Sequence, residues 1–300
     1  MDTIDMTIQK AVVPIAGLGT RLFPASHACK KEFFPVVGPD GIARALVHHQ
    51  IIDLVDAGIE RICIIVQPGE DRLVTDYFRG PGPEYVKRLD KYPALALEAR
   101  RMQAALDRIT FAVQHEQEGY GHAVYQSKAF AAGDPVLLCL GDHLFRGNGN
   151  SCHRQLMRAY DQCGGKSVSA VNRIGPDELK GYGTIAGRRL QEAPDLIDVS
   201  LIVEKPALEV ARDRLHVDGL PENKWLGWFG MHALAPSIYK VLQAMIEGDV
   251  RQRGEFQLTY AQELQRQQEG YCALEMREGR RFDFGVPQDF VKSVAEFVKA

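Results

Sequence analysis

Short apolar runs alternate with amphipathic stretches through the first half of the chain, and this alternation constrains the fold more than any other feature. The runs have the length of buried strands, and the stretches between them place apolar residues at helical spacing. Strands that alternate with helices predict a mainly parallel sheet with helices on both faces. The expected strands are residues 11–16, 62–66, 109–113 and 136–140, and the expected helices are residues 43–57, 95–106 and 122–130.

The pattern loosens after Asp142, although further strands and helices can still be assigned. Neither an internal repeat nor a low-complexity tract divides the chain, and residues 80–93 are predicted to be a surface insertion because they are rich in Pro, Gly and charge. We therefore predict one α/β domain over residues 1–300, a Rossmann-like mixed, mainly parallel sheet with halves at about 8–145 and 146–300. The second half is expected to contain strands 167–171, 196–203 and 226–232 and helices 236–246, 257–267 and 288–298.

Composition excludes several classes of function for this 300-residue chain. A formal net charge of -3 provides no strongly basic field to gather nucleic acid. No apolar run approaches the roughly 20 residues of a membrane helix, and residues 1–9 lack the basic cluster of a signal peptide. The six cysteines form no CxxC pair, which favours a reducing cytoplasm.

A glycine-containing loop, Gly17-Leu18-Gly19-Thr20-Arg21, follows the first expected strand. Glycines let backbone N–H groups approach phosphate oxygens closely, and Arg21 adds a planar fork of donors, although a tight turn remains the alternative. The dinucleotide fingerprint would need a third glycine where Leu22 stands, so a nicotinamide dehydrogenase is disfavoured. Residues 164–167 are disfavoured as a P-loop because Tyr160 occupies the position of its first glycine.

Charged residues lie at or near the ends of several other segments. Lys31 lies beyond the glycine loop and could neutralise phosphate, or could belong to a solvated basic pair. Asp142 ends a buried strand, where it could hold Mg²⁺ or could cap a turn. The pair Glu204-Lys205 could contact a sugar hydroxyl and a phosphate, or form a surface ion pair. Asp283 lies between two aromatic residues, where an acid is costly unless it is paired or bound to a metal.

Taken in chain order, these segments resemble the bacterial UTP–glucose-1-phosphate uridylyltransferases, within the sugar-nucleotide pyrophosphorylase superfamily. The similarity spans nearly the whole chain. Its segments are 10–25, 31–37, Gln114 with 119–124, Asp142, 182–183, 203–206, 254–259, and Asp283 with Gly285. The chain departs from the family at 38–44, where Asp-Lys-Pro is usual, at Gly141, where Pro is common, and around Trp225 and Trp228.

The resemblance implies a fold of the nucleotide-diphospho-sugar transferase type, with a nucleotide-binding first half and a smaller sugar-binding second half. It also implies a cytoplasmic homo-oligomer, a dimer or tetramer, that makes UDP-glucose from UTP and glucose 1-phosphate with Mg²⁺. By resemblance, the catalytic residues are Arg21 and Lys31, and the metal is held by Asp142 and Asp283. The nucleotide is expected to contact Ala16, Gly17, Gly19, Thr20, Gln114, Gly119 and Gly121. The sugar phosphate is expected to contact Gly183, Glu204 and Lys205.

A sugar 1-phosphate is already an anionic nucleophile at neutral pH, so the implied reaction needs no general base. We expect direct in-line attack on the α-phosphorus, helped by positioning and by cations. One alternative is the same reaction with another base or sugar, dTTP–glucose-1-phosphate thymidylyltransferase above all, because thymine and uracil share the edge that Gln114 would contact. Another is a non-catalytic sugar-nucleotide sensor, which the retained metal-binding acids disfavour.

Overall fold

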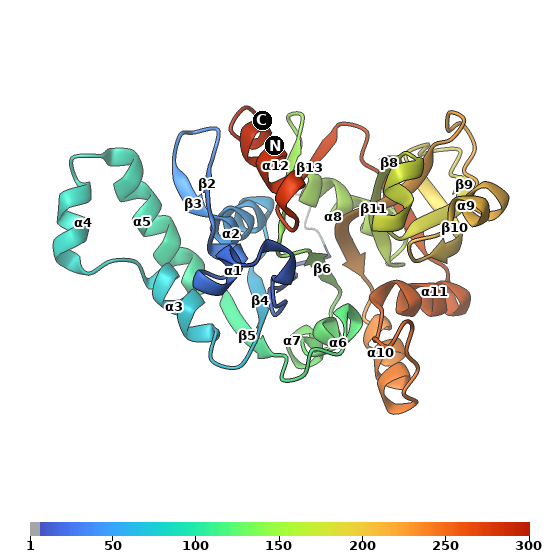
Figure 1. Cartoon of the computed structure of the whole chain (residues 1–300), viewed down its shortest axis with the longest axis horizontal. Helices are drawn as coiled ribbons and strands as arrows, with labels where there is room; N and C mark the ends of the chain where they lie inside the picture. Colours follow the sequence, from blue (N-terminus) through green and yellow to red (C-terminus); the bar gives the residue numbers. More distant parts are fainter. Residues whose placement is uncertain (1–6) are drawn as a thin grey trace.

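The computed structural model describes residues 7–300, so part of the segment considered for a signal peptide lies outside the described residues. A nine-stranded mixed sheet runs through the molecule (Figure 1). In spatial order its strands are β5 (Ile109–Val113), β4 (Arg61–Val66), β1 (Lys10–Pro14), β6 (Val136–Cys139), β11 (Trp225–Leu234), β8 (Val168–Ile174), β12 (Cys272–Glu275), β10 (Leu196–Val203) and β9 (Thr184–Arg189).

The four strands of the first half are parallel, as predicted. The chain moves from β1 outward through β4 to β5 and then returns to place β6 on the other side of β1. Adjacent residues of β1 face opposite sides of the sheet, so Val13 packs in one core cluster and Val12 in another. The reversal of strand order between β1 and β6 creates a crevice at their carboxyl ends, where ligands of open α/β sheets bind.

Helices cover both faces of this sheet, which confirms the predicted fold class. One face carries α2 (Leu46–Ala57), α3 (Asp71–Arg79) and α8 (Cys152–Gln162). The other carries α6 (Tyr120–Tyr125), α7 (Lys128–Ala131), α10 (Ile238–Glu247) and α11 (Leu258–Glu269), at the lower edge of Figure 1. The remaining helices are α1 (Ala25–Ala28), α4 (Pro83–Leu89), α5 (Pro93–Leu106), α9 (Leu208–Arg214) and α12 (Pro287–Phe297).

Pairing in the second half is mostly antiparallel. The β6–β11, β11–β8, β12–β10 and β10–β9 pairs are antiparallel, and only β8 and β12 are parallel there. All ten residues of β11 are buried because this strand lies in the middle of the sheet. The mixed sheet thus consists of a parallel first half and a largely antiparallel second half, whose strands bring distant segments together.

Two small sheets complete the fold. Strand β2 (Pro35–Val37) pairs with β3 (Ala43–Ala45), and β7 (His143–Gly147) pairs with β13 (Gly279–Asp283). The second pair sets Asp283 opposite His143 and so places Asp283 beside the end of β6. Nothing in the sequence pattern predicts this pairing, because 131 residues separate the end of β7 from the start of β13.

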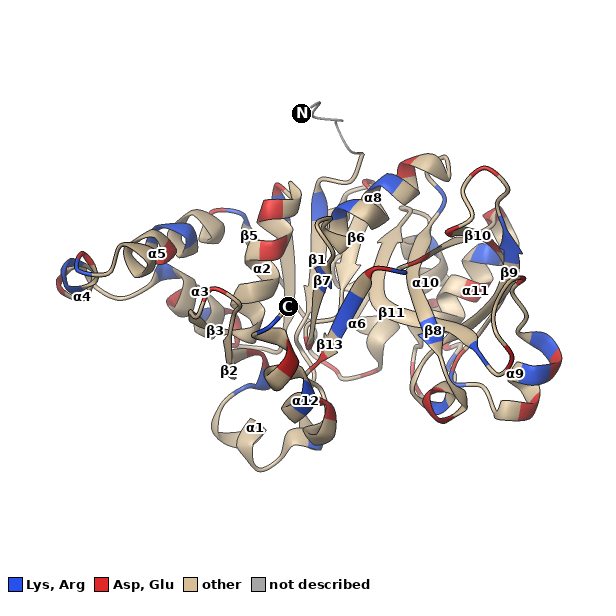
Figure 2. Cartoon of the chain, turned by 90° about the horizontal axis from the view of Figure 1, so that it is seen from above, with Lys and Arg blue, Asp and Glu red and all other residues tan. Residues whose placement is uncertain are grey.

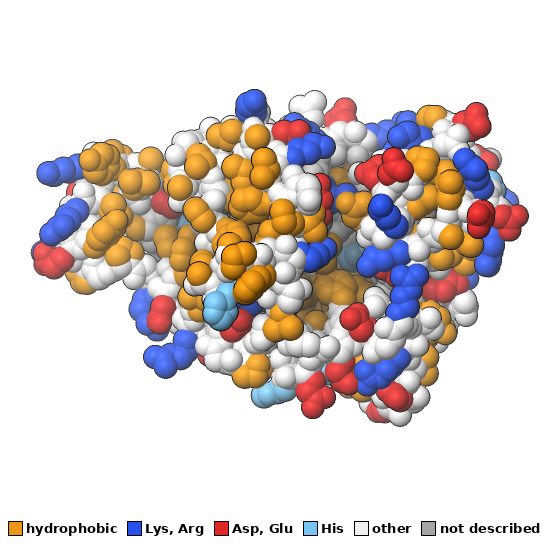
Figure 3. Space-filling view, viewed as in Figure 1, with side chains coloured by type: hydrophobic (Ala, Val, Ile, Leu, Met, Phe, Trp, Pro, Cys, Tyr) orange, Lys and Arg blue, Asp and Glu red, His pale blue; other side chains and the backbone are white. Residues whose placement is uncertain are grey.

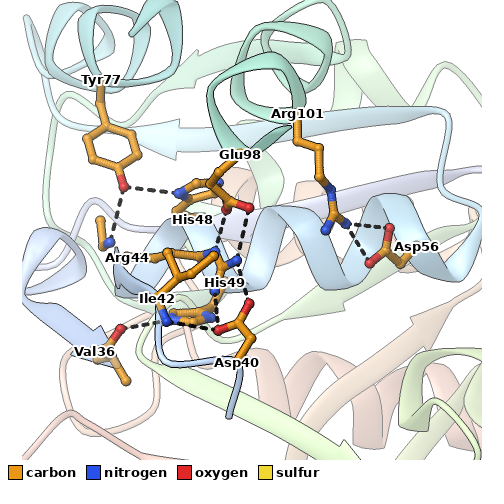
Figure 4. Close-up of polar contacts among 11 residues, drawn as sticks. Val36, Asp40, Ile42, Arg44, His48, His49, Asp56, Tyr77, Glu98 and Arg101 are labelled. Atoms are coloured by element: carbon orange, nitrogen blue, oxygen red, sulfur yellow. Dashed lines mark hydrogen bonds and ion pairs between the residues drawn. The ribbon is translucent and has the colours of Figure 1, made fainter. Parts of the chain in front are cut away.

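Helices α3, α4 and α5 form an arm that extends away from the sheet (Figure 1). Residues 80–93 lie at its end on the surface, as predicted, although they include α4, which buries no residue. A polar cluster ties the arm to the small β2–β3 sheet: Arg44 of β3 donates hydrogen bonds to the buried Glu98 of α5 and to the half-exposed Asp40 (Figure 4). Glu98 in turn lies 3.2 Å from Nε2 of His48.

Basic and acidic residues are interspersed along the ribbon of both halves (Figure 2), in keeping with the small net charge. Within residues 7–300, no helix is both long and apolar enough to cross a bilayer.

Candidate active site

Three adjoining cavities form a cleft at the carboxyl ends of β1 and β6, with volumes of about 570, 440 and 360 Å³. Gly17 and Lys31 line both the first and the second cavity. Arg21 and Asp142 line both the second and the third. Figure 3 shows the hollow between the two halves, with Lys and Arg side chains at its margin. The cleft is therefore continuous from the glycine loop to the second half of the sheet.

The predicted glycine loop follows β1 directly and opens onto this cleft. Gly19 has a φ of 65°, the left-handed region that favours glycine, and it begins a single turn of 3₁₀ helix. A Cβ atom placed on Gly17 would meet no heavy atom within 4 Å, so the backbone here borders open space. Ala16 and Thr20 line the second cavity together with Gly17. The loop thus offers an exposed main chain to a ligand.

Arg21 lies at the junction of the second and third cavities. Its side chain has no ion-pair partner among residues 7–300. A guanidinium without an internal carboxylate keeps its donors available for phosphate oxygens. Its position would let it contact ligands in both cavities.

Lys31 contacts the strand-end acid directly, with Nζ 2.6 Å from Oδ2 of Asp142. Burial alone would lower the pKa of Lys31, but Asp142 and Glu32 outweigh it and raise that pKa above its ordinary value. Burial alone would raise the pKa of Asp142, but His143 and Lys31 hold it well below its usual range. Both members of the pair are therefore charged at neutral pH. Burial raises the pKa of the adjacent Glu32 to about 7.

Asp142, His143 and Asp283 each offer a ligand atom, and these atoms lie within 4.8 Å of one another. Gly285 permits this approach, because a Cβ there would lie 2.5 Å from Oδ2 of Asp142. Burial disfavours charge on these groups, yet the carboxylates raise the pKa of His143 and the imidazole lowers that of Asp283. His143 Nε2 has no hydrogen-bond partner in the described chain. Carboxylate oxygens beside an orphaned imidazole nitrogen are a donor set that fits a divalent ion.

Gln114 and Gly121 were expected to contact the base, and Gly119 to bind the nucleotide; of these three residues, Gln114 and Gly119 line the second cavity. Gln114 is only 3% exposed, and its Nε2 donates to the carbonyl of Gly119 at 3.4 Å. Gly121 is not among the residues that line this cavity. Its N–H donates to the carbonyl of Phe256 at 2.8 Å, and a Cβ there would lie 2.6 Å from that oxygen. Gly121 therefore allows α6 to pack closely, and its contact with the base stays a prediction.

The predicted sugar-side residues Gly183, Glu204 and Lys205 all line the third cavity. Lys205 adopts a φ of 46°, which is uncommon for a residue other than glycine and is often found at functional positions. Its Nζ lies 3.5 Å from Oε1 of Glu204. A Cβ on Gly183 would lie 2.4 Å from Nε1 of Trp228, so the indole packs directly against this glycine.

Sequence reasoning missed Arg281, which also lines the third cavity. Its Nη1 donates to the carbonyl of Trp228 at 2.8 Å, and its guanidinium lies over the ring of Tyr182 at 4.2 Å. Arg281 pairs with no acidic side chain in the part of the chain that the structure describes. A signal was present, because alternate residues of a strand share a face and Arg281 stands two residues before Asp283.

Comparison with known proteins agrees with this geometry. The family model described as nucleotidyl transferase matches residues 10–296. UTP–glucose-1-phosphate uridylyltransferase 2 of Staphylococcus saprophyticus is 32% identical over 290 residues, 97% of this chain and 92% of the relative. The UTP–glucose-1-phosphate uridylyltransferase of Bacillus subtilis is 32% identical over 296 residues, 97% of this chain and 91% of the relative.

Solved structures show the same fold. An apo UDP-glucose pyrophosphorylase matches with a TM-score of 0.80 at 24% identity, covering 97% of this chain and 98% of its own. A UTP-bound enzyme of Acinetobacter baumannii matches with a TM-score of 0.76 at 24% identity, and the match covers 97% of this chain and 93% of that enzyme. The chain belongs to the nucleotidyl transferase family and, within it, to the family of UTP–glucose-1-phosphate uridylyltransferases.

Proposed function

We propose that this chain joins UTP to glucose 1-phosphate, forming UDP-glucose and releasing pyrophosphate. The observation that carries the proposal is the continuity of the cleft, in which Arg21 and Asp142 border both the cavity of the glycine loop and the cavity of Lys205. Two anionic substrates bound in these cavities would meet at that shared border. The names of the relatives supply the identity of the base and of the sugar.

The reaction requires positioning and positive charge rather than acid–base chemistry. A phosphate oxygen of glucose 1-phosphate bonds to the α-phosphorus of UTP, and the bond from that phosphorus to the β-phosphate bridging oxygen breaks. The electron pair leaves with pyrophosphate, so no proton has to move. Arg21 and Lys31 offset the charge of the triphosphate, and Lys205 and Arg281 hold the sugar phosphate.

We assign a divalent ion, Mg²⁺ in the simplest case, to Asp142 and Asp283. When bound, the ion would supply positive charge that reduces repulsion between the two phosphate groups. Lys31 contacts one oxygen of Asp142 and His143 contacts the other, so the carboxylate is held in a fixed orientation before any ligand binds.

A substrate matrix tests the proposal. UTP, dTTP, GTP, CTP and ATP are each combined with the 1-phosphates of glucose, galactose and N-acetylglucosamine, and pyrophosphate release is measured. We expect the highest kcat/KM for UTP with glucose 1-phosphate. A higher value with dTTP would make the protein a thymidylyltransferase. Binding of UDP-glucose without pyrophosphate release from any pair would make it a sensor.

Two further properties that the resemblance implies remain predictions. We infer a homo-oligomer, a dimer or a tetramer, which size-exclusion chromatography with light scattering tests. We also infer a cytoplasmic location, which fractionation of the source cells tests.

A further inference from the structure

Strand β11 contributes three alternate residues to the wall of the third cavity. Trp228, Gly230 and His232 all line this cavity, because alternate residues of a strand share a face. The rings of Trp228 and His232 are nearly perpendicular, with their centroids 5.6 Å apart. His232 is therefore a polar side chain on the wall of the sugar cavity to which the proposed reaction gives no role.

The two nitrogens of the His232 imidazole have different surroundings. Nδ1 faces the interior, 2.6 Å from Oγ of Ser169 and 3.0 Å from Nε2 of Gln262. Nε2 of the ring has no hydrogen-bond partner within residues 7–300. His232 is only 3% exposed, but unlike Nε1 of Trp228 its Nε2 is not fully enclosed by protein, so this atom borders the cavity.

The groups behind the ring determine where its proton lies. The amide of Gln262 donates to the hydroxyl of Tyr271 at 2.9 Å, and that hydroxyl lies 2.7 Å from Oγ of Ser169. Tyr271 can therefore donate to Ser169, and Ser169 can donate to Nδ1 of His232. With Nδ1 as an acceptor, the proton of the neutral ring is on Nε2. The opposite tautomer would set Nδ1–H against the amide N–H₂ of Gln262, two donors 3.0 Å apart.

The polar groups of this wall suit an uncharged ligand that carries hydroxyl groups. Burial lowers the pKa of His232 to about 3, so its ring is a neutral N–H donor at pH 7. Glu204 lies beside the same wall, because a Cβ on Gly183 would be 2.4 Å from Nε1 of Trp228 and 3.1 Å from Oε2 of Glu204. A carboxylate that accepts and an imidazole that donates can bind different hydroxyls of one pyranose ring.

We propose that Nε2–H of His232 donates a hydrogen bond to a hydroxyl group of the sugar 1-phosphate, and that Ser169, Tyr271 and Gln262 fix the ring in the tautomer that does so. His232 is then a specificity-determining residue that selects against sugars lacking this hydroxyl. The inference rests on the proposed function, because it names the substrate group that the sugar cavity recognises. Loss of this one hydrogen bond should reduce kcat/KM about 10–100-fold.

Nitrogen-15 NMR of the full-length protein, labelled at histidine, tests the tautomer without turnover. The signals of His232 are identified by their loss in His232→Asn. We expect the proton on Nε2 in the free protein, and a shift of the Nε2 signal when UDP-glucose is added. A proton on Nδ1 would overturn the proposal, whatever the activity of the protein. An unchanged Nε2 signal in protein saturated with UDP-glucose would also overturn it.

Two amide variants separate the cavity contact from the packing behind the ring. The amide nitrogen of Gln lies near the position of Nε2 of His, and that of Asn lies near the position of Nδ1. We expect His232→Gln to keep kcat/KM for glucose 1-phosphate within about fivefold of wild type, and His232→Asn to lower it about 10–100-fold. The KM for UTP should change less than about twofold in both. A purely structural role predicts the reverse order, because only Asn keeps the contact with Ser169, and that order would contradict the proposal.

The 2-, 3-, 4- and 6-deoxy analogues of glucose 1-phosphate identify the hydroxyl group. One analogue should lose about 10–100-fold in kcat/KM with the wild type but little with His232→Asn, because the variant already lacks the donor. Equal losses in the two proteins for all four analogues would overturn the proposal. Absence of pyrophosphate release from glucose 1-phosphate with the wild type would instead be a failure of the proposed function, and the tautomer would then still decide this inference.

Discussion

The two halves of the cleft present different chemical groups to their ligands. The first half offers exposed main chain at Gly17, where a Cβ would enter open space, beside the side chains of Arg21 and Lys31. The second half offers side chains packed against one another, and a Cβ on Gly183 would collide with the indole of Trp228. A cradle of main chain is encoded locally, whereas a site of packed side chains depends on the whole fold around it.

Asp142 belongs to both sides of this comparison, so its replacement should have the largest effect. We expect Asp142→Asn to reduce kcat by about 10²–10³ or more, because the variant loses a charge that pairs with Lys31 and contacts His143. Pyrophosphate release under saturating substrates measures this change. Near-normal turnover in a folded variant would remove Asp142 from the reaction.

Arg281 tests whether the second half alone holds the sugar phosphate. Loss of a charge-assisted hydrogen bond should raise the KM for glucose 1-phosphate about 10–100-fold in Arg281→Gln, with the KM for UTP changed less than about twofold. Arg280→Gln is the matched control, because Arg280 pairs with Glu296 on the surface at 2.7 Å. Equal increases in both KM values would place Arg281 outside the sugar subsite.

Replacing one glycine in each half of the cleft by alanine compares how tightly the two halves are packed. Gly183→Ala should lower the free energy of unfolding by about 1–3 kcal/mol, because the new methyl group meets Nε1 of Trp228. Gly17→Ala should change it by less than about 0.5 kcal/mol while raising the KM for UTP, since its methyl group would occupy space left for the ligand. Urea unfolding and initial rates measure the two effects. A stable Gly183→Ala variant would contradict the packed description of the second half.

A small effect, on stability alone, should come from Asp40, which lies outside the cleft in the first half. The hydrogen bonds from Arg44 lower the pKa of Asp40 from 3.8 to about 2. A carboxyl group whose pKa is lower in the folded state stabilises the protein when the pH is above its pKa in the unfolded state. That contribution is lost as the pH falls through the pKa of the folded state. Because the side chain is half exposed, Asp40→Asn should cost about 0.5 kcal/mol at pH 7.

Unfolding measured from pH 7 to pH 2 tests this sign. The difference between Asp40→Asn and wild type should shrink as pH falls from about 4 towards 2, as the wild-type carboxyl becomes protonated. A difference that grows towards low pH would show that another group dominates.

Sequence reasoning predicted the first half more completely than the second. The strand before Gly17 and the strand before Asp142 are short buried runs, and their alternation with helices predicts that they are parallel. Placement of Asp283 and Arg281 depends on pairing between β7 and β13, which are far apart in the sequence and carry no local turn signal. His143 was missed for a related reason: the carboxylate of Asp283, 3.4 Å from its Nε2, is supplied by that same long-range pair.

Initial rates over a grid of UTP and glucose 1-phosphate concentrations test the central claim most directly. If both substrates occupy adjoining cavities at once, double-reciprocal plots of pyrophosphate release should intersect, as expected for a complex that contains both substrates. Parallel lines would indicate that UTP reacts with the protein before the sugar phosphate binds, and would contradict direct attack within one continuous cleft.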